Sequence, residues 1–479
     1  MTDDSSVTGA LAEFVSAFPA AAIPTAARAA AGRAVLDTTG VALAGARERC
    51  TEIVRTTVTA GDGKGHATLL GSGGRASPLD AALINGTAAH ALDYDDTHAS
   101  FRGHPSAPIV AAALAAAELA GATGAELLDG YVLGLEVAGR IGRSLGASHA
   151  TQGFHSTATL GVLGAAVAAS RVLGLSGPQV VAALGVAASS ASGLRLNFGT
   201  MAKPLHAGNA ARAGLLAALL SRRGFTAAND ALAPATGFTA VYSPGDGDLI
   251  ATADLGECWQ VTSPGIAVKK YPCCNRGHRA ADAVLHLVLA HDLQPAEVAR
   301  IEVRMPPGQV DSEGRVGPMT YPRPMTGLEA KFSMQYVVAA ALFDRELRIA
   351  TFTDAAVRRP EVLEFIGRVR PVAVPVAGAA PGTADAVEVV VHLRGSGTVA
   401  SRVSYARGDP RGGEVLGSAE LADKYRDCAS IALAPAAVER SLDLLQQLGT
   451  LDTVSRLTEV LSSDDGPTAT ATASGRSGR

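Results

Sequence analysis

Residues 299–305 are ARIEVRM, and apolar side chains alternate with charged ones along the whole stretch. Such alternation predicts a strand that has one buried face. Residues 386–393 (AVEVVVHL) and 399–405 alternate in the same way. Between these strands lie two segments whose apolar residues have helical spacing, at about 277–292 and 327–345. The middle of the chain is therefore predicted to be a small α+β block.

Helical periodicity flanks this block on both sides. From Pro78 to Gly224 one predicted helix follows another, with proline near the starts and glycine past the ends. The pattern changes near Pro264, and helical spacing returns after Gly413. We therefore predict a mainly α fold, in which a large all-helical domain formed by both chain ends carries an inserted, smaller α+β lid domain. The predicted parts are helical residues 1–264, a lid at 265–409, a returning helical segment at 410–462 and a disordered, low-complexity tail at 463–479.

Composition and charge exclude several classes of protein. A formal net charge of -4 over 479 residues gives no general attraction to nucleic acid or to a membrane surface. The apolar runs are too short to span a bilayer. Five cysteines, odd in number and widely scattered, argue against a disulfide framework and fit a reduced, cytoplasmic setting. An anionic substrate would have to be attracted by local charge.

Common catalytic signatures are missing from the sequence. It contains no GxSxG elbow, no HExxH, no P-loop and no GxGxxG after a predicted strand. No cysteine spacing of the CxxC type indicates zinc. The prediction is an enzyme that uses neither a cofactor nor a metal.

Three polar clusters each lie just before a predicted helix. They are HALDYDDTH, which starts at His90 and is followed by His104-Pro-Ser; GFHST around His155; and KPLH from Lys203. The N-terminus of a helix offers unpaired N–H groups and partial positive charge, which attract carboxylates. If the three helix starts converge, they form an anion site with histidine and lysine as acid and base groups. Taken singly, each cluster has an ordinary explanation as helix caps, a solvated acidic loop or an exposed lysine.

A fourth cluster, KKYPCCNRGHR at residues 269–279, carries five basic residues where the predicted lid begins. The plain alternative is a basic surface patch. Cys273 and Cys274 are interpreted as small loop residues, because no further Cys or His stands at ligand spacing.

Six blocks of sequence, in this order, resemble the MmgE/PrpD family over roughly residues 8–450. They are HALDYDDTH, HPSAPIVAAALAAAE, GFHSTATLGVLGAAVAAS, GTMAKPLHAGNAARAGLLAALLSRRGF, KKYPCCNRGHRAADAVL and EAKFSMQYVVAAAL. The family comprises 2-methylcitrate dehydratases, cis-aconitate decarboxylases and an iminodisuccinate epimerase. The resemblance implies a helical domain built from both chain ends, an inserted α+β lid and a homodimer.

The resemblance also implies a set of site residues. Those carried over from the helical domain as catalytic are Asp93, His104, His155 and Lys203, with Thr97 as a substrate-binding residue. The lid would add Tyr321 as a catalytic residue, and Lys270 and His278 as substrate-binding residues. Because Lys269 and Lys270 are adjacent, which of the two lysines faces the site stays open. His104, His155 and Lys203 are expected to line one cleft, with His278 facing them.

These residues fit proton chemistry at a carbon next to a carboxylate. The negative charge that develops there needs nearby cations and hydrogen-bond donors, and histidine suits the proton transfer. We predict a cofactor-independent lyase that dehydrates or decarboxylates a small di- or tricarboxylic acid. The alternatives are an isomerase or epimerase of a dicarboxylate on the same scaffold and a non-catalytic carboxylate-binding homologue.

Overall fold

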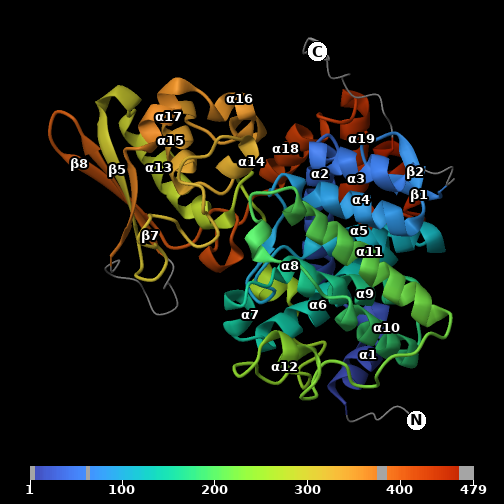
Figure 1. Ribbon diagram of the computed structural model, residues 1–479. Coiled ribbons are helices and arrows are strands. Elements are labelled where there is room, and N and C mark those ends of the chain that lie inside the picture. The colour runs from blue at the N-terminus through green and yellow to red at the C-terminus, as the bar shows by residue number, and fades with distance from the viewer. Residues whose placement is uncertain (1–5, 61–64, 375–385, 463–479) are drawn as a thin grey trace, which may run out of the picture.

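A computed structural model describes residues 6–60, 65–374 and 386–462 of the chain. The predicted disordered tail at 463–479 lies outside the described residues. The chain is mainly helical with a small sheet, as the sequence predicts. In Figure 1 the sheet and its helices lie to one side of a larger body of helices.

The larger body consists almost wholly of helices. A short antiparallel pair, β1 (Ala67–Leu69) and β2 (Gly74–Ala76), lies at its edge. In chain order the helices before the sheet are α1 (Val7–Ala17), α2 (Thr25–Gly45), α3 (Arg49–Val58), α4 (Pro78–Ala91), α5 (Ser106–Ala120), α6 (Gly124–Ser144), α7 (Ser148–Thr151), α8 (Ser156–Thr159), α9 (Gly161–Val172), α10 (Gly177–Ser189), α11 (Ala202–Arg222) and α12 (Phe238–Tyr242).

The two ends of the chain share one apolar core. After the sheet the chain returns as α18 (Ser418–Ala429), α19 (Pro435–Gln446) and α20 (Ser455–Leu461). Helices α18 and α19 pack on α2, and their buried leucines join the same cluster as those of α1 to α11. Helix α5 is apolar on all sides and buried along most of its length, which is typical of a helix at the centre of a core.

A second apolar core surrounds a four-stranded sheet of order β6-β5-β7-β8. Its strands are β5 (Val298–Met305), β6 (Val369–Ala373), β7 (Val387–Leu393) and β8 (Thr398–Val403). Strand β5 pairs antiparallel with β7, so that Val303 lies opposite Val389, and parallel with β6. The helices of this part are α13 (His278–His291), α14 (Gly327–Ala330), α15 (Met334–Asp344), α16 (Asp354–Val357) and α17 (Pro360–Ile366).

Local details differ from the sequence prediction in three places. The helix predicted at 327–345 is broken between α14 and α15, where Ser333 caps α15 by accepting a hydrogen bond from the backbone of Tyr336. Within the run of helices predicted from Pro78 to Gly224, the stretch that begins at Ser156 is divided into α8 and α9. Strand β6 was not predicted, since it is short and contains Pro371, which is tolerated because β6 is an edge strand.

A two-residue ribbon ties the larger body to the chain that leads into the sheet. Strand β3 (Thr97–His98) pairs antiparallel with β4 (Ile266–Ala267). The loop that follows α4 is thereby held beside the segment 269–279. Among the described helices, none is long and apolar enough to cross a membrane.

Candidate active site

The packing of α4 against α11 brings two polar side chains together at one end of the helix pair. A methyl group added at Gly208 would lie 2.3 Å from the carbonyl oxygen of Leu83, so the two backbones touch where no larger residue fits. His90, in the last turn of α4, and Lys203, in the first turn of α11, consequently meet, with Lys203 Nζ donating to His90 Nε2 at 2.9 Å. Both side chains are buried.

Asp93 turns the chain back toward this pair just after α4. Its φ of 52° is in the left-handed region, which non-glycine residues seldom adopt. Its Oδ1 accepts a hydrogen bond from Lys203 Nζ at 2.6 Å and lies 3.2 Å from Lys269 Nζ, which also donates to the Asp93 carbonyl oxygen at 2.6 Å. Burial alone would raise the pKa of Asp93, but the two ammonium groups outweigh it and hold that pKa well below its ordinary value.

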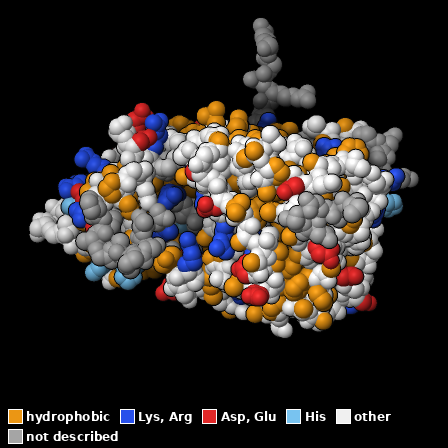
Figure 2. All heavy atoms as spheres, turned by 90° about the horizontal axis from the view of Figure 1, so that it is seen from below, with side chains coloured by type: hydrophobic (Ala, Val, Ile, Leu, Met, Phe, Trp, Pro, Cys, Tyr) orange, Lys and Arg blue, Asp and Glu red, His pale blue; other side chains and the backbone are white. Residues whose placement is uncertain are grey.

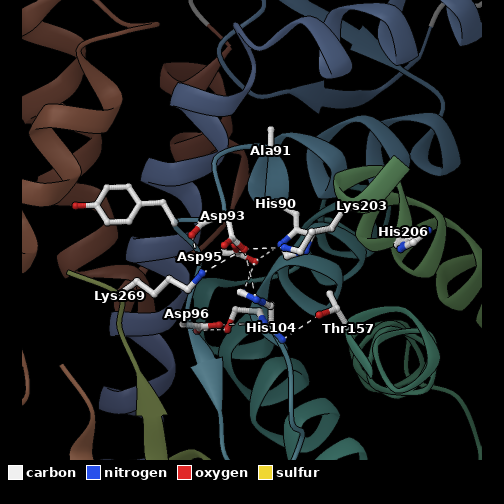
Figure 3. A network of polar contacts seen from close by, with 12 residues as sticks. His90, Ala91, Asp93, Asp95, Asp96, His104, Thr157, Lys203, His206 and Lys269 are labelled. Carbon is white, nitrogen blue, oxygen red and sulfur yellow. Dashed lines mark hydrogen bonds and ion pairs between the residues drawn. The ribbon is translucent and has the colours of Figure 1, made fainter. Parts of the chain in front are cut away.

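The His90 ring lies between the carboxylate of Asp95 and the ammonium group of Lys203 (Figure 3). Its Nδ1 lies 2.8 Å from Asp95 Oδ2, while its Nε2 faces the Lys203 ammonium. Because Lys203 donates to Nε2, the proton of the neutral ring must be on Nδ1 and must point at Asp95. Burial lowers the pKa of His90 to about 3, although Asp95 opposes the change, so the ring is neutral near pH 7.

His104 lies between the two carboxylates of the same turn. Its Nε2 is 3.6 Å from Asp93 Oδ1 and its Nδ1 is 3.4 Å from Asp95 Oδ2. The backbone N–H of His104 donates to Thr157 Oγ1 at 3.1 Å, which fixes the loop before α5 against α8. Burial lowers the pKa of His104, Asp95 opposes this, and Lys269 adds to it.

His155 completes a group of three stacked or edge-on imidazoles. The His90 ring centroid lies 4.6 Å from that of His104 and 5.7 Å from that of His155, so His104 and His155 flank His90. His155 Nδ1 is 3.0 Å from His206 Nδ1, one turn beyond Lys203 on α11. Burial, with Lys203 adding to it, lowers the pKa of His155 well below its ordinary value and that of His206 to about 4.

Of these groups, Asp93, His104, His155 and Lys203 line a cavity of about 440 Å³ between the larger body and the sheet-containing part. Figure 2 shows Lys and Arg side chains gathered around the hollow between the two parts. Asp93 and Asp409 are the carboxylates in the cavity lining, and Arg411 binds Asp409 at 2.6 Å. The cationic residues of the lining are Arg102, Arg195, Lys203, Arg276, Arg279 and Arg411. A strongly positive cavity in a chain of net charge -4 suits a substrate with several carboxylates.

Most predicted site residues line this cavity. The structure brings together the five that were expected from the helical domain: Asp93, Thr97, His104, His155 and Lys203.

The three residues expected from the lid do not line it. Lys270 points away toward Glu420, at 3.6 Å, whereas its neighbour Lys269 reaches Asp93. His278 is buried behind the segment, with Nε2 3.2 Å from the Cys273 carbonyl oxygen. Tyr321 packs over Gly199 and donates to the Phe198 carbonyl oxygen at 3.3 Å.

Three residues of the network had no assigned role in the sequence prediction: His90, Asp95 and His206. Lys269 was the open alternative to Lys270, and it is the lysine that reaches Asp93. The spacing of His90 and Asp93 was visible, since residues three apart share a helix face, but α4 ends between them. His206 lies one turn after Lys203 on α11, and that periodicity could have indicated it.

A cation could in principle use part of this cluster. His90, Asp93, Asp95 and His104 each bring one ligand atom within 4.8 Å of the others. Two ammonium groups, however, already lie on Asp93, and Lys203 also occupies Nε2 of His90. Lysine therefore supplies the positive charge that a metal ion would bring, and it would repel such an ion.

The chain is similar to known proteins over most of its length. The MmgE/PrpD N-terminal domain matches residues 9–249, and the MmgE/PrpD C-terminal domain matches residues 271–449. The cis-aconitate decarboxylase of Homo sapiens is 31% identical over 404 residues, which cover 82% of this chain and 81% of that protein. That of Mus musculus is 32% identical over 81% of this chain and 79% of its own length. That of Aspergillus terreus (strain NIH 2624 / FGSC A1156) is 26% identical over 89% and 90%.

Proposed function

This chain belongs to the MmgE/PrpD family and is a lyase, and we propose that it decarboxylates a small unsaturated tricarboxylic acid of the cis-aconitate type. The observation that carries the proposal is the position of His104, between Asp93 and Asp95 and beside a cavity with six cationic residues. The names of the relatives, all cis-aconitate decarboxylases or a protein like them, support the choice of substrate class.

The cationic lining accounts for binding of the proposed substrate. A tricarboxylate carries about three negative charges near neutral pH, because carboxyl groups ionise near pH 4. Arginine binds carboxylates through paired N–H groups, and the cavity presents five arginines around Lys203. Asp93 repels such an anion less than a free carboxylate would, since Lys203 and Lys269 neutralise it.

The reaction consumes one proton for each CO₂ released. The bond from the methylene carbon to its carboxylate breaks, and that electron pair forms a double bond to the central carbon. The electrons of the original double bond move to the outer vinylic carbon, which takes up a proton. Negative charge passes through this carbon and its carboxylate in the transition state, where cations such as Lys203 stabilise it most effectively.

We assign proton delivery to His104 and a hydrogen-bonding role to His155. His104 has carboxylates at both ring nitrogens, which favour its protonated form once a bound trianion adds further negative charge. His155 has another imidazole, His206, as its partner, and burial together with Lys203 and the neighbouring histidines lowers its pKa. A neutral His155 can orient a substrate carboxylate without supplying the proton.

The proposed function has a structural and an assembly part. We propose that residues 265–409 act as a lid, since Lys269, Asn275, Arg276 and Arg279 approach the cavity from that segment.

A homodimer would cover exposed apolar side chains such as Leu196 and Phe225. Light scattering at micromolar concentration is expected to give the mass of two chains.

The five cysteines are free, which supports a reducing, cytoplasmic compartment.

One experiment tests the activity against its alternatives. The protein is incubated in heavy water with cis-aconitate, with methylcitrate and with amino-dicarboxylates, and the mixtures are followed by NMR. The proposal expects CO₂ release from cis-aconitate and one deuterium in the product, at the carbon that was vinylic. Loss of water from methylcitrate without decarboxylation would make it a hydro-lyase. Exchange or inversion at carbon without loss of CO₂ or water would make it an isomerase, and binding without turnover a binding protein.

A further inference from the structure

A buried lysine outside the cavity holds the two segments that form the site. Lys424, on α18, is buried, and its Nζ forms an ion pair with Asp37 Oδ1 at 2.7 Å. The Nζ also donates hydrogen bonds to the carbonyl oxygens of Tyr94 at 3.0 Å and of Lys269 at 2.9 Å. The ammonium lies 3.9 Å from the centroid of the Tyr94 ring.

Both carbonyl groups belong to the site's own backbone. Tyr94 stands between Asp93 and Asp95, and Lys269 is the residue whose ammonium reaches Asp93. Lys424 is absent from the lining of the catalytic cavity and instead lines a separate cavity of about 900 Å³, together with Lys270. It contacts the two segments from behind, while Lys269 Nζ joins them in front through the Asp93 carbonyl oxygen.

We propose that Lys424 is a positioning residue for the reaction proposed above: it fixes the Asp93 turn and the Lys269 backbone relative to one another. The inference rests on the proposed function for its kinetic consequences, and on the contacts alone for its structural ones. On this proposal, helix α18 supports the geometry of the catalytic cavity although no residue of α18 lines that cavity.

The backbone at Asp93 explains why such a support is needed. A non-glycine residue at a φ of 52° is held by its surroundings and not by its own preference. Lys269 holds its carbonyl group, and Lys424 holds the next carbonyl group along the chain. Without the Lys424 ammonium, two buried carbonyl oxygens lose a donor, and the turn is free to relax away from Lys269.

Asp37 makes a clean set of variants possible. It is buried on α2, and burial raises its pKa while Lys424 opposes the change. Lys424→Met alone leaves an unpaired buried carboxylate, which is strongly destabilising. The double variant Asp37→Asn with Lys424→Met removes both charges, so it should fold while the carbonyl groups of Tyr94 and Lys269 remain unsupported. Lys424→Arg keeps a cation that can donate to the same acceptors, with the adjoining cavity to accommodate its extra length.

The first measurement is steady-state kinetics on cis-aconitate, with thermal unfolding in parallel. We expect the folded double variant to lose roughly 10- to 100-fold in kcat, the scale for misplaced catalytic groups, with a smaller change in KM because the cavity arginines are untouched. Lys424→Arg is expected to recover most of the loss. A double variant that folds and turns over at the wild-type rate would overturn the proposal.

The second measurement does not depend on turnover. Histidine ring signals of the enzyme without substrate are titrated by NMR in wild type and double variant. Lys269 lowers the pKa of His104, as do burial and Lys203, while Asp95 raises it. If Lys269 drifts from Asp93, the pKa of His104 should rise in the variant. If the pKa of His104 is the same in the folded double variant as in wild type, the proposal for Lys424 is overturned, even if cis-aconitate proves not to be the substrate. If the wild type is inactive on cis-aconitate but the pKa of His104 rises in the double variant, only the proposed function is refuted.

Discussion

His155 and His206 form a hydrogen-bonded pair, with their Nδ1 atoms 3.0 Å apart. Both rings have pKa values lowered by burial and by Lys203, so both are neutral near pH 7 and one must donate to the other. The pair fixes the orientation of His155 at the cavity and determines which of its nitrogens carries the proton.

His155→Ala is therefore expected to be more damaging than His206→Ala. Removing His155, which lines the cavity and is assigned to orient a substrate carboxylate, should lower kcat by roughly 10²–10³-fold, the range for losing a preorganised hydrogen-bonding group. Removing its partner should cost roughly 10- to 100-fold, because His155 stays present but less well oriented. Steady-state kinetics measures both. His286, exposed on α13 and outside this cavity, is the control, and equal losses for His286→Ala and His206→Ala would contradict the assignment.

Replacement of Lys269 and replacement of the adjacent Lys270 should have very different effects on catalysis. Lys269 Nζ lies 3.2 Å from Asp93 Oδ1, whereas Lys270 Nζ pairs with Glu420 at 3.6 Å. Lys269→Met should lower kcat/KM by at least roughly 10²-fold, since Asp93, which lines the cavity, loses one of the two ammonium groups that neutralise it, so that its charge would repel an anionic substrate. Lys270→Met should keep nearly wild-type kinetics. If Lys270→Met proves the inactive variant, the segment faces the site the other way.

Metal removal should leave the activity unchanged. Lys203 and Lys269 already provide positive charge to the group formed by His90, Asp93, Asp95 and His104. The protein is dialysed against a strong chelator, its metal content is measured by elemental analysis, and turnover is compared before and after. Activity that disappears and returns with iron or zinc would establish a metal site in this cluster.

Asp96 should make the stability of the protein depend on pH. Burial raises its pKa to about 8, while an unfolded Asp titrates near 3.9. Between roughly pH 4 and pH 8 the native state therefore binds a proton that the unfolded chain lacks, so the free energy of unfolding falls as pH rises, by up to about 1.4 kcal/mol per pH unit. This contribution is present at low pH and is lost as pH passes through the folded pKa.

Asp96→Asn should remove that slope. Urea unfolding at pH 5.5, 7 and 8 is expected to show the variant gaining stability relative to wild type as pH rises. Asp443→Asn, on the exposed face of α19, is the matched control and should follow the wild-type curve. Parallel curves for wild type and Asp96→Asn would mean that Asp96 is ionised in the native protein.

The sequence by itself was enough for most of the elements and for the family. The alternation of ARIEVRM predicted β5, and proline and glycine punctuation predicted the succession of helices between Pro78 and Gly224. Local signals of this sort depend only on residues a few positions apart, so they can be recognised in the sequence without knowledge of the fold. The same locality explains why β6 was missed: five residues with a proline carry little periodicity of their own, and they form a strand because β5 offers them a free edge.

Only the tertiary structure decided how the site is assembled. Lys269 rather than Lys270 reaches Asp93, and the backbone carbonyl groups of Lys269 and Tyr94 both accept hydrogen bonds from Lys424, more than 150 residues further along the chain. His90 lies in the site because α4 and α11 are in close contact at Gly208. His278 lies outside it, because its side chain points into the core and contacts the Cys273 carbonyl oxygen. Side-chain direction depends on contacts between segments distant in sequence, and those contacts exist only once both apolar cores have formed.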